Sequence, residues 1–367
     1  MQRDFHYYAT YCAAYLAGHS HEDAVRIAYA AALVDFCSRD YLTEIGAPLT
    51  AATTQLQLEM MEAWTDKVGR QEITSIWAAF HFLPGDLKAE VKRGGKRYKD
   101  KYRMICGTNG DLLKETVKLA AGEGLEAVGL AMHVLADTWA HQYFAGTPSM
   151  VINNTNYYFY ELIREGEKEV RRKVTFRHNP TKPDDIEQGI FTNTLGQISE
   201  NSVMNLGHGR AGHLPDYSFI RYAYLPAWGD YREIIKDNPS DFYHAFGQMI
   251  YAMKTLREEK EFQVKTYDFE AFRAYEEEVR SILTTRSVDS DLGWKTLGEK
   301  LSGKEIPDFD MDEFRLEYTG SPESDRENTV LGRFIRSAIR QKEMLIRRVA
   351  ESGNPLAGTL QERRKDR

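Results

Sequence analysis

The stretch Ala127–Phe144, AVGLAMHVLADTWAHQYF, predicts a buried helix around which the rest of the chain is arranged. Its residues are mostly apolar, and no Gly or Pro occurs between 130 and 145, which favours a helix. Three ionisable side chains, His133, Asp137 and His141, follow each other at intervals of four residues. Because an α-helix turns about 100° per residue, all three lie on one face, each about 6 Å further along the axis.

This row of side chains is typical of a metal centre. Each neighbouring pair can share one ion, whereas the two histidines, about 12 Å apart along the axis, can hardly share one. The spacing therefore places Asp137 between two ions, and imidazole with carboxylate ligands suits zinc or a similar transition ion. The alternative is a polar network within the core. Burying three such groups on one stripe without compensation would be costly, which favours the metal.

The first 81 residues supply three further candidate ligands. His6 lies on a predicted helix over 4–17, and Asp35 ends a run of small and apolar residues on a second predicted helix from 21 to about 36. A carboxylate at that place needs a partner, because apolar surroundings disfavour its charge. His81 follows an apolar run and precedes a Pro-Gly turn, so its ring is free to point into a cleft.

A loop with two internal glycines, LGHGRAGHLPD, supplies the remaining candidates. Glycine permits positive φ and close backbone approach, so the loop is able to bring His208 and His213 toward one point. Asp216 follows as a further ligand or as an acceptor that orients a ligand. An ordinary polar loop is the alternative.

Composition and charge restrict the class of protein. The net charge of −7 argues against general nucleic-acid binding. No apolar run approaches the roughly 20 residues that cross a bilayer, which predicts that there is no transmembrane segment. The N-terminus lacks the apolar centre of a signal peptide, and the scattered cysteines indicate a reducing compartment. These features predict a cytoplasmic protein.

The pattern of apolar residues predicts an all-α protein in three parts. A helical metal-binding core domain is expected over 1–260, a C-terminal helical extension packed on it over 261–350, and a frayed tail over 351–367. The aromatic segment over 157–173, YYFYELIREGEKEVRRK, is predicted to be a helix. The strongly basic segment over 88–103, KAEVKRGGKRYKDKYR, is predicted to be a solvated loop or hairpin, with a phosphate-binding lip as the alternative.

The order of the candidate ligands resembles the superfamily of bacterial zinc-dependent phospholipases C and fungal zinc nucleases. Those enzymes are multi-helix bundles with a three-zinc cluster. Their ligands recur as an early His, an Asp at a helix end, a His in an HFxxPD-like turn, an HxxxD pair and a further His. In this sequence the similarity spans roughly residues 4–145, and the matching positions are His6, Asp35, His81 in FHFLPGD, His133 with Asp137, and His141. The opening MQRDFHYYATY also resembles that of an uncharacterised bacterial family.

The sequence departs from that superfamily in three ways. The His after HxxxD usually comes two residues later, and the next pair, HxxxE, is absent. His208 and His213 are the candidates to replace that pair. The enzymes also bind one zinc through a mature N-terminus exposed by signal cleavage, whereas this sequence shows no signal peptide. Two ions are therefore the safer expectation, with three as the upper limit.

The resemblance implies a metal-dependent hydrolase of phosphate esters, either phosphodiesters or phosphomonoesters, that acts on a small substrate. Two ions bridged by Asp137 would bind the phosphoryl oxygens, and a water molecule activated by one of them would attack in line. Asp35 or Asp216 would act as the base. The alternative is a non-enzymatic all-α protein in which the same residues hold a structural metal or a buried polar network, and which acts through a partner. A weaker alternative is membrane-surface recognition through Tyr157–Tyr160.

Overall fold

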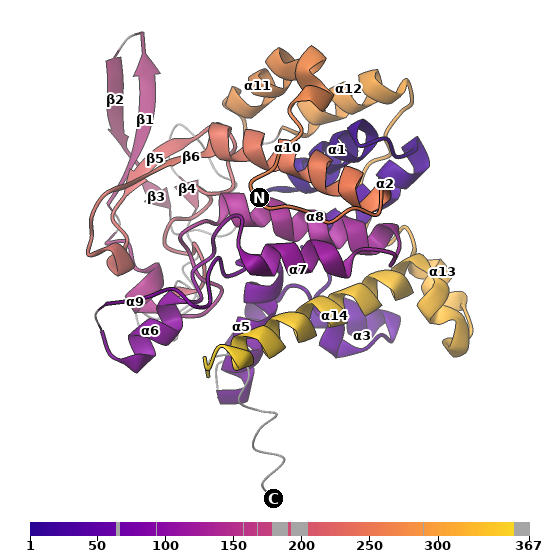
Figure 1. Ribbon diagram of the computed structural model, residues 1–367, viewed down its shortest axis with the longest axis horizontal. Coiled ribbons are helices and arrows are strands. Elements are labelled where there is room, and N and C mark those ends of the chain that lie inside the picture. Colours follow the sequence, from indigo (N-terminus) through magenta and orange to yellow (C-terminus); the bar gives the residue numbers. More distant parts are fainter. Residues whose placement is uncertain are drawn as a thin grey trace, which may run out of the picture.

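Helices dominate the fold, and a small sheet lies at one side of them (Figure 1). The computed structural model describes residues 1–63, 67–92, 94–156, 158–166, 168–177, 190–191, 205–288 and 290–355. None of the helices in these ranges is both long and apolar enough to cross a bilayer. The predicted frayed tail lies outside the described residues from 356 onward, as does Tyr157.

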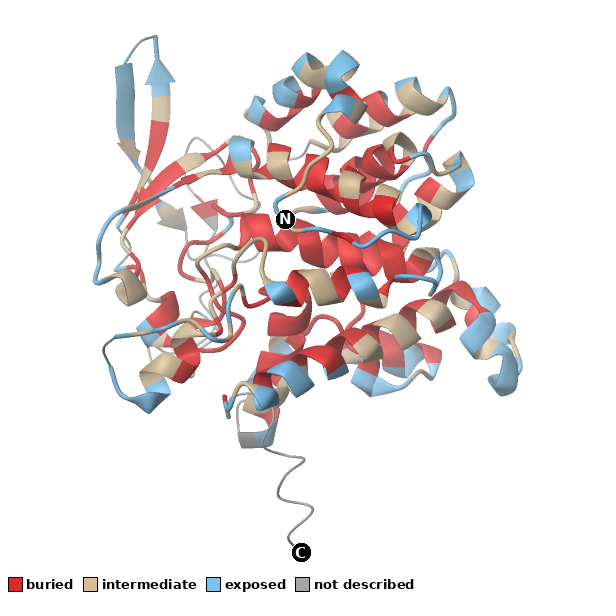
Figure 2. Cartoon of the chain, in the orientation of Figure 1, coloured by how far each residue is buried: buried red, intermediate tan, exposed pale blue. Residues whose placement is uncertain are grey.

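The predicted central helix is confirmed as α8 (Leu125–Ala140), and its residues from Glu126 onward are buried. Figure 2 shows α8 as an almost uniformly buried helix in the middle of the molecule. A helix that is apolar around most of its circumference must be covered on all sides. The helices that contact it directly are α2 (His21–Leu33), α5 (Lys67–Phe80), α7 (Asp111–Leu119), α10 (Asn238–Arg257) and α14 (Val330–Glu351).

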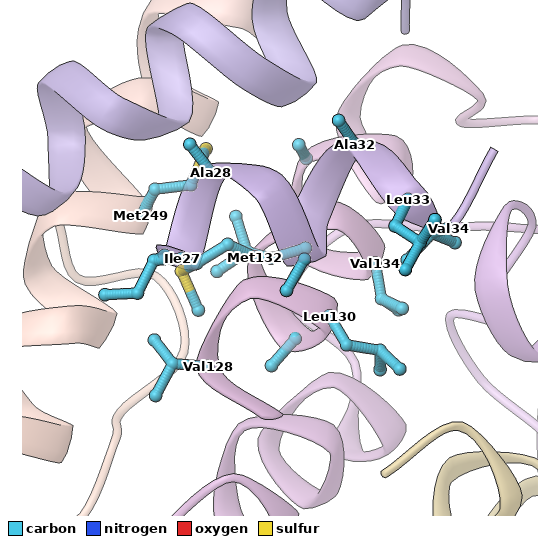
Figure 3. Close-up of a cluster of buried hydrophobic side chains, with 14 of the residues drawn as sticks. Ile27, Ala28, Ala32, Leu33, Val34, Val128, Leu130, Met132, Val134 and Met249 are labelled. Carbon is cyan, nitrogen blue, oxygen red and sulfur yellow. The ribbon is translucent and has the colours of Figure 1, made fainter. Parts of the chain in front are cut away.

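Helices α2 and α8 approach each other closely because small side chains lie at their contact. Ile27 and Ala28 of α2 and Met132 and Val134 of α8 belong to one buried apolar cluster (Figure 3). At Gly129 of α8, an added Cβ would lie 2.2 Å from the carbonyl oxygen of Ile27. The backbones of the two helices are therefore in contact at a position where only glycine fits.

The N-terminal helices have ends that differ from those expected. The helix predicted over 4–17 begins with wide π-helical turns, η1 (Phe5–Ala9), and continues as α1 (Thr10–Leu16). The helix predicted from 21 to about 36 ends at Leu33, and a turn follows it.

The short helices that follow before the sheet are α3 (Arg39–Ile45), η2 (Leu49–Ala51), α4 (Gln57–Ala63), α6 (Lys96–Tyr102) and α9 (Met150–Asn153). Because α6 lies within the basic segment 88–103, that segment is partly helical rather than only loop.

The sheet is antiparallel and has the strand order β2-β1-β5-β6. A separate pair of very short strands is parallel. The four strands of the sheet are β1 (Phe159–Glu165), β2 (Lys168–Lys173), β5 (Arg221–Tyr224) and β6 (Ile234–Asp237), and the separate pair is β3 (Phe176–Arg177) with β4 (Ile190–Phe191). A short 3₁₀ turn, η4 (Ala227–Gly229), lies between β5 and β6.

The helix predicted over 157–173 is wrong, because this segment forms the β1–β2 hairpin. The hairpin turns at Gly166, whose φ of 64° suits glycine. Phe159 of β1 stacks on Tyr224 of β5, with ring centroids 5.5 Å apart and ring planes 2° apart. Aromatic contacts of this kind across strands stabilise a sheet, and here they outweigh a local pattern that favoured a helix. The prediction of an all-α fold therefore holds for the helical majority but omits the sheet.

The C-terminal helices share the core with the N-terminal ones. Their bounds are η5 (Glu270–Tyr275), α11 (Glu276–Thr284), α12 (Asp291–Ser302), α13 (Arg315–Gly320) and η6 (Glu323–Asn328), followed by α14. Helix α12 contacts η1 and α1, and α14 contacts α8 and α5. Phe334 and Leu345 of α14 belong to the same buried cluster as Leu130 of α8. The segment predicted as an extension therefore packs directly on the central helix.

We expect Gly129→Ala to lower the free energy of unfolding by about 2 kcal/mol, because the added methyl meets the Ile27 carbonyl and the helices must separate. Helix propensity alone predicts the opposite sign, a gain of about 1 kcal/mol. Urea unfolding followed by circular dichroism measures the difference. Gly95→Ala is the control, since nothing lies within 4 Å of its added Cβ, and it should change stability by less than about 0.5 kcal/mol. A Gly129→Ala protein as stable as the parent would contradict this packing.

Candidate metal centre

Side chains from five parts of the chain meet on one face of α8. They form three groups, each of which can hold a metal ion, because one ligand atom of each member lies within 4.8 Å of the others. The groups are His6, His133 and Asp137; Asp35, His81 and His133; and His141, His208 and Asp216. The structure thus brings together all the predicted site residues except His213. As the spacing on α8 predicts, its two histidines belong to different groups.

Asp137 lies at the centre, and its two carboxylate oxygens face different partners. Oδ1 lies 3.1 Å from Nε2 of His6 and 2.7 Å from the α-amino group of Met1. Oδ2 lies 3.2 Å from Nδ1 of His81 and 3.2 Å from Nε2 of His133. Only 1% of the Asp137 side chain is exposed. This is the arrangement of a carboxylate that can bridge two ions, as the sequence predicts for this residue.

Turns at helix ends position the ligands that come from outside α8. Asp35 lies in the turn that follows α2, and His81 lies in the turn that follows α5, where its backbone N–H donates to the carbonyl of Trp77. His6 lies on η1, and its ring stacks on that of His133 with centroids 3.8 Å apart. The wide π-helical turns of η1 thus bring a buried imidazole against α8.

Backbone carbonyls fix the orientation of four of the imidazole rings. Carbonyl oxygens only accept hydrogen bonds, so the ring nitrogen beside each carbonyl carries the proton. These donors are Nδ1 of His133 to Ala31 at 2.9 Å, Nδ1 of His141 to His81 at 2.7 Å, Nε2 of His81 to Thr53 at 3.0 Å, and Nδ1 of His208 to Gly212 at 2.7 Å. In a neutral ring, the second nitrogen is then an unprotonated acceptor. This is how metal-binding histidines are commonly held.

Several of the unprotonated nitrogens face other acceptors, although the Met1 amine also lies 3.3 Å from Nε2 of His141. Nδ1 of His81 lies 3.3 Å from Nε2 of His133, and both approach the same oxygen of Asp137. Nε2 of His141 lies 3.1 Å from Oδ1 of Asp216. Lone pairs that face each other in a buried place repel unless a proton or a metal ion lies between them. A metal ion among these atoms would relieve that repulsion, as the Met1 amine does in part beside His141 and Asp216.

Protonated histidines are a poor source of that positive charge. Burial lowers the pKa of His6, His133 and His208 to about 4 in each case, so these rings are neutral at pH 7. Burial also raises the pKa of Asp35. These three imidazoles thus provide lone pairs rather than charge, which is the state in which imidazole binds metals.

The other two carboxylates remain charged. Burial disfavours the charge of Asp137 and Asp216, but neighbouring groups hold both pKa values well below the usual range. For Asp137 those groups are His141, the Met1 amine and His133, and for Asp216 they are His208, the Met1 amine and His141. Although burial also disfavours the charged amine of Met1, Asp137, Asp216 and Asp35 raise its pKa to about 10. Negative charge therefore stays in the centre at neutral pH.

The α-amino group of Met1 lies in the centre, although the sequence analysis set an N-terminal ligand aside because the sequence shows no signal peptide. It donates to Oδ1 of Asp137, and it lies 3.3 Å from Nε2 of His141 and 3.5 Å from Oδ1 of Asp216. A backbone amine leaves no signal in a pattern of side chains. In the folded chain it lies between two of the three groups.

His213 is not among the residues that meet at the centre. Its side chain is exposed, and its ring faces Tyr217 edge-on at 6.2 Å. The loop turns at Gly212, with φ of 54°, so that the carbonyl before His213 is directed at the ring of His208. The two histidine rings consequently diverge. The third member of the group with His141 and His208 is Asp216, and not His213.

Solvent reaches the edge of the centre at one depression of about 480 Å³. Its lining residues are Met1, Gln2, Arg3, Asp4, Asp35, Phe36, Val288 and Asp291. The Asp35 side chain is 32% exposed, in contrast to the enclosed Asp137. The Asp35 carboxylate is therefore within reach of a dissolved molecule, whereas Asp137 lies enclosed behind it.

Comparison with known proteins gives a family but no function. A model described as "Family of unknown function (DUF6765)" matches residues 1–349, so the chain belongs to this family. No curated protein matches the chain, and no solved structure does.

We expect the metal-free protein, kept in a chelator, to lose stability as the pH falls from about 6.5 to 4. The pKa of His208 is about 4 in the folded state against 6.5 in its unperturbed state, so the unfolded chain binds the extra proton. This histidine contributes up to about 1.4 kcal/mol per pH unit to the slope. His208→Gln should make the slope shallower, as measured by urea unfolding at a series of pH values.

The exposed His213 provides the matched control for this measurement. His213→Gln removes a histidine of the same loop that lies outside the three groups, and the two variants are compared under identical conditions. A slope that is the same in wild type and in His208→Gln would contradict a neutral, buried His208.

Proposed function

We propose that this member of the DUF6765 family is a metal-dependent hydrolase of small phosphate esters, with two or three zinc-type ions in its centre. The observation that carries the proposal is the set of four imidazoles whose protons are directed at backbone carbonyls and whose free nitrogens meet buried carboxylates. Such a set has unfavourable lone-pair contacts by itself and becomes a set of ligands once cations are present.

The donor atoms fit zinc, which takes imidazole nitrogen and carboxylate oxygen at tetrahedral sites. Asp35, His81 and His133 would hold one ion, and Oδ2 of Asp137 lies beside the two histidines of this group. The group His141, His208 and Asp216 would hold a second ion. His6 and Oδ1 of Asp137, with the Met1 amine in its unprotonated form, would hold a third.

Ions in such sites supply activation of a water molecule and neutralisation of phosphoryl oxygens. The chain's own residues supply position and proton transfer. Asp35 is the base we favour, because its carboxylate lines the depression and can accept a proton from a water molecule there. Asp216 is less exposed, at 12% of its side chain, and is not among the residues that line that depression. Asp137 and the carbonyl-bound histidines hold the ligand atoms in place.

Two further features support a hydrolase with a small substrate. A depression of about 480 Å³ is within the usual size range for small-molecule sites. The order of ligands along the chain also resembles that of zinc-dependent phospholipases C and fungal zinc nucleases. In this chain His208 and Asp216, eight residues apart, would take the place of the HxxxE pair of those enzymes.

The second candidate is a non-enzymatic protein whose metal or polar network is structural and which acts through a partner. The enclosure of the centre favours it: the side chains of His6 and His133 are 0% exposed, and that of Asp137 is 1% exposed. Structural sites have all positions filled by the protein, whereas catalytic sites keep one position for water or substrate. An open coordination position therefore distinguishes the two candidates.

We expect the purified wild-type protein to contain between about two and three zinc ions per chain by elemental analysis. It should also hydrolyse bis(p-nitrophenyl) phosphate. Asp137→Asn should reduce the metal content below about one ion per chain and abolish hydrolysis, because this carboxylate serves more than one group. Asp241→Asn is the matched control: it lies outside the centre and pairs with Lys236, so metal content should not change. A wild-type protein with less than one metal ion per chain would contradict the proposal.

Cobalt(II) substitution separates the enzyme from the structural alternative. Phosphate added to the cobalt protein should change its visible absorption if a coordination position is open. An unchanged spectrum, together with full metal content and no hydrolysis, would favour the structural site.

A further inference from the structure

The basic segment 88–103 has a charge opposite to that of the whole chain. It contains eight lysines and arginines and two acidic residues, a net charge of 8 − 2 = +6, in a chain with a net charge of −7. Such an asymmetry attracts a polyanion to one part of a protein that otherwise repels it. The function proposed above makes no use of this segment.

Several of these cations are available for binding. Lys92 and Lys96 are exposed, and Lys99 is partly exposed. None of the three forms an ion pair within the described ranges of the chain. By contrast, lysines elsewhere on the surface, such as Lys300 and Lys304, pair with glutamates. Charge that is not neutralised by the protein itself can neutralise phosphates of a ligand.

Aromatic rings accompany these lysines. Tyr98 and Tyr102 of α6 stack with centroids 6.2 Å apart, Tyr102 meets Trp228 of η4 at 6.0 Å, and Trp228 meets Tyr143 at 5.9 Å. All four rings are partly exposed, so we call this continuous set the ring row. Lys96 and Lys99 lie on the same short helix as Tyr98 and Tyr102, and lysines with aromatic rings are the combination that binds unpaired nucleic-acid bases together with their phosphates.

The ring row is fixed to the backbone just beyond the metal centre. Trp228 donates from Nε1 to the carbonyl of Tyr143, and Tyr98 donates from its hydroxyl to the carbonyl of Trp228. Tyr143, two residues after His141, also pairs through its N–H with the carbonyl of Cys106, just beyond α6. Its φ of 81° is rare for a residue with a side chain, and these contacts hold it there. The position of the ring row is therefore set by several hydrogen bonds.

From this arrangement we infer that Lys92, Lys96 and Lys99 with the ring row bind single-stranded nucleic acid. A duplex fits less well, because its bases are stacked on each other and cannot use the rings. A membrane surface also fits less well, since the large apolar side chains that are exposed in the described residues include none in segment 88–103. Membrane-surface helices need such an apolar face.

The test compares binding of a labelled, mixed-sequence single-stranded RNA to the full chain and to two charge variants by fluorescence anisotropy. The triple variant K92Q/K96Q/K99Q should weaken binding at least tenfold. It should also reduce the slope of log K against log salt by about 2, because three phosphate contacts are lost. K260Q/K300Q/K304Q is the matched control, with the same loss of charge at lysines outside segment 88–103 that pair with glutamates, and it should bind like wild type.

Two further probes decide between ligand classes. The same sequence as a duplex should bind at least fivefold more weakly than the single strand, and vesicles with 30% phosphatidylserine should not bind. Equal binding of duplex and single strand would overturn the role of the rings. If the wild-type protein binds vesicles but not RNA, and K92Q/K96Q/K99Q no longer binds vesicles, the ligand is a membrane surface and the inference is overturned. Circular dichroism and metal content confirm that each variant is folded. RNA binding is measured without hydrolysis, so a negative binding result would contradict this inference and would not test the proposed phosphoesterase activity.

Discussion

The structure depends on a carboxylate that is buried in the middle of an apolar helix. Asp137 is almost fully enclosed and keeps its charge; the Met1 amine donates to Oδ1, and ring nitrogens of His6, His81 and His133 lie within 3.2 Å of its oxygens. An isolated charge in such a place would cost many kcal/mol, so the fold must supply compensation from distant parts of the chain. His6, His81 and the Met1 amine come from segments far apart in the chain that also pack in the apolar core around α8.

The same requirement explains the closeness of the helices. His133 is oriented by the carbonyl of Ala31, which is available only because α2 lies against α8 with alanines and Gly129 at the contact. Hydrogen bonds from His81 to Thr53, and from His141 to the His81 carbonyl, extend the network to two further segments. These three rings are therefore oriented by backbone carbonyls on one side and meet carboxylates on the other. The close contact of α2 with α8 therefore both packs the small residues and orients the His133 ring.

Local sequence patterns predicted the parts of this centre that follow helix geometry. The four-residue spacing on α8 and the positions of Asp35 and His81 at helix ends gave residues that do converge. Three features depend on contacts between distant segments and so lay beyond such patterns. The β1–β2 hairpin forms because Phe159 stacks on Tyr224, the Met1 amine has no side-chain signal, and the choice of Asp216 over His213 depends on the turn at Gly212. Periodicity describes which face a residue occupies, but not which distant residue meets it.

The layout of the carboxylates bears on whether the centre is structural or catalytic. A purely structural centre gains nothing from an exposed ligand, because water competes with each bond that it makes. Asp137 satisfies that condition, but Asp35 does not, since about a third of its side chain faces solvent at the depression. Burial of the histidines and exposure of one carboxylate divide the centre into a fixed part and an accessible part. This division is what a hydrolytic site requires, because the ligands must stay in place while one face admits water and an ester.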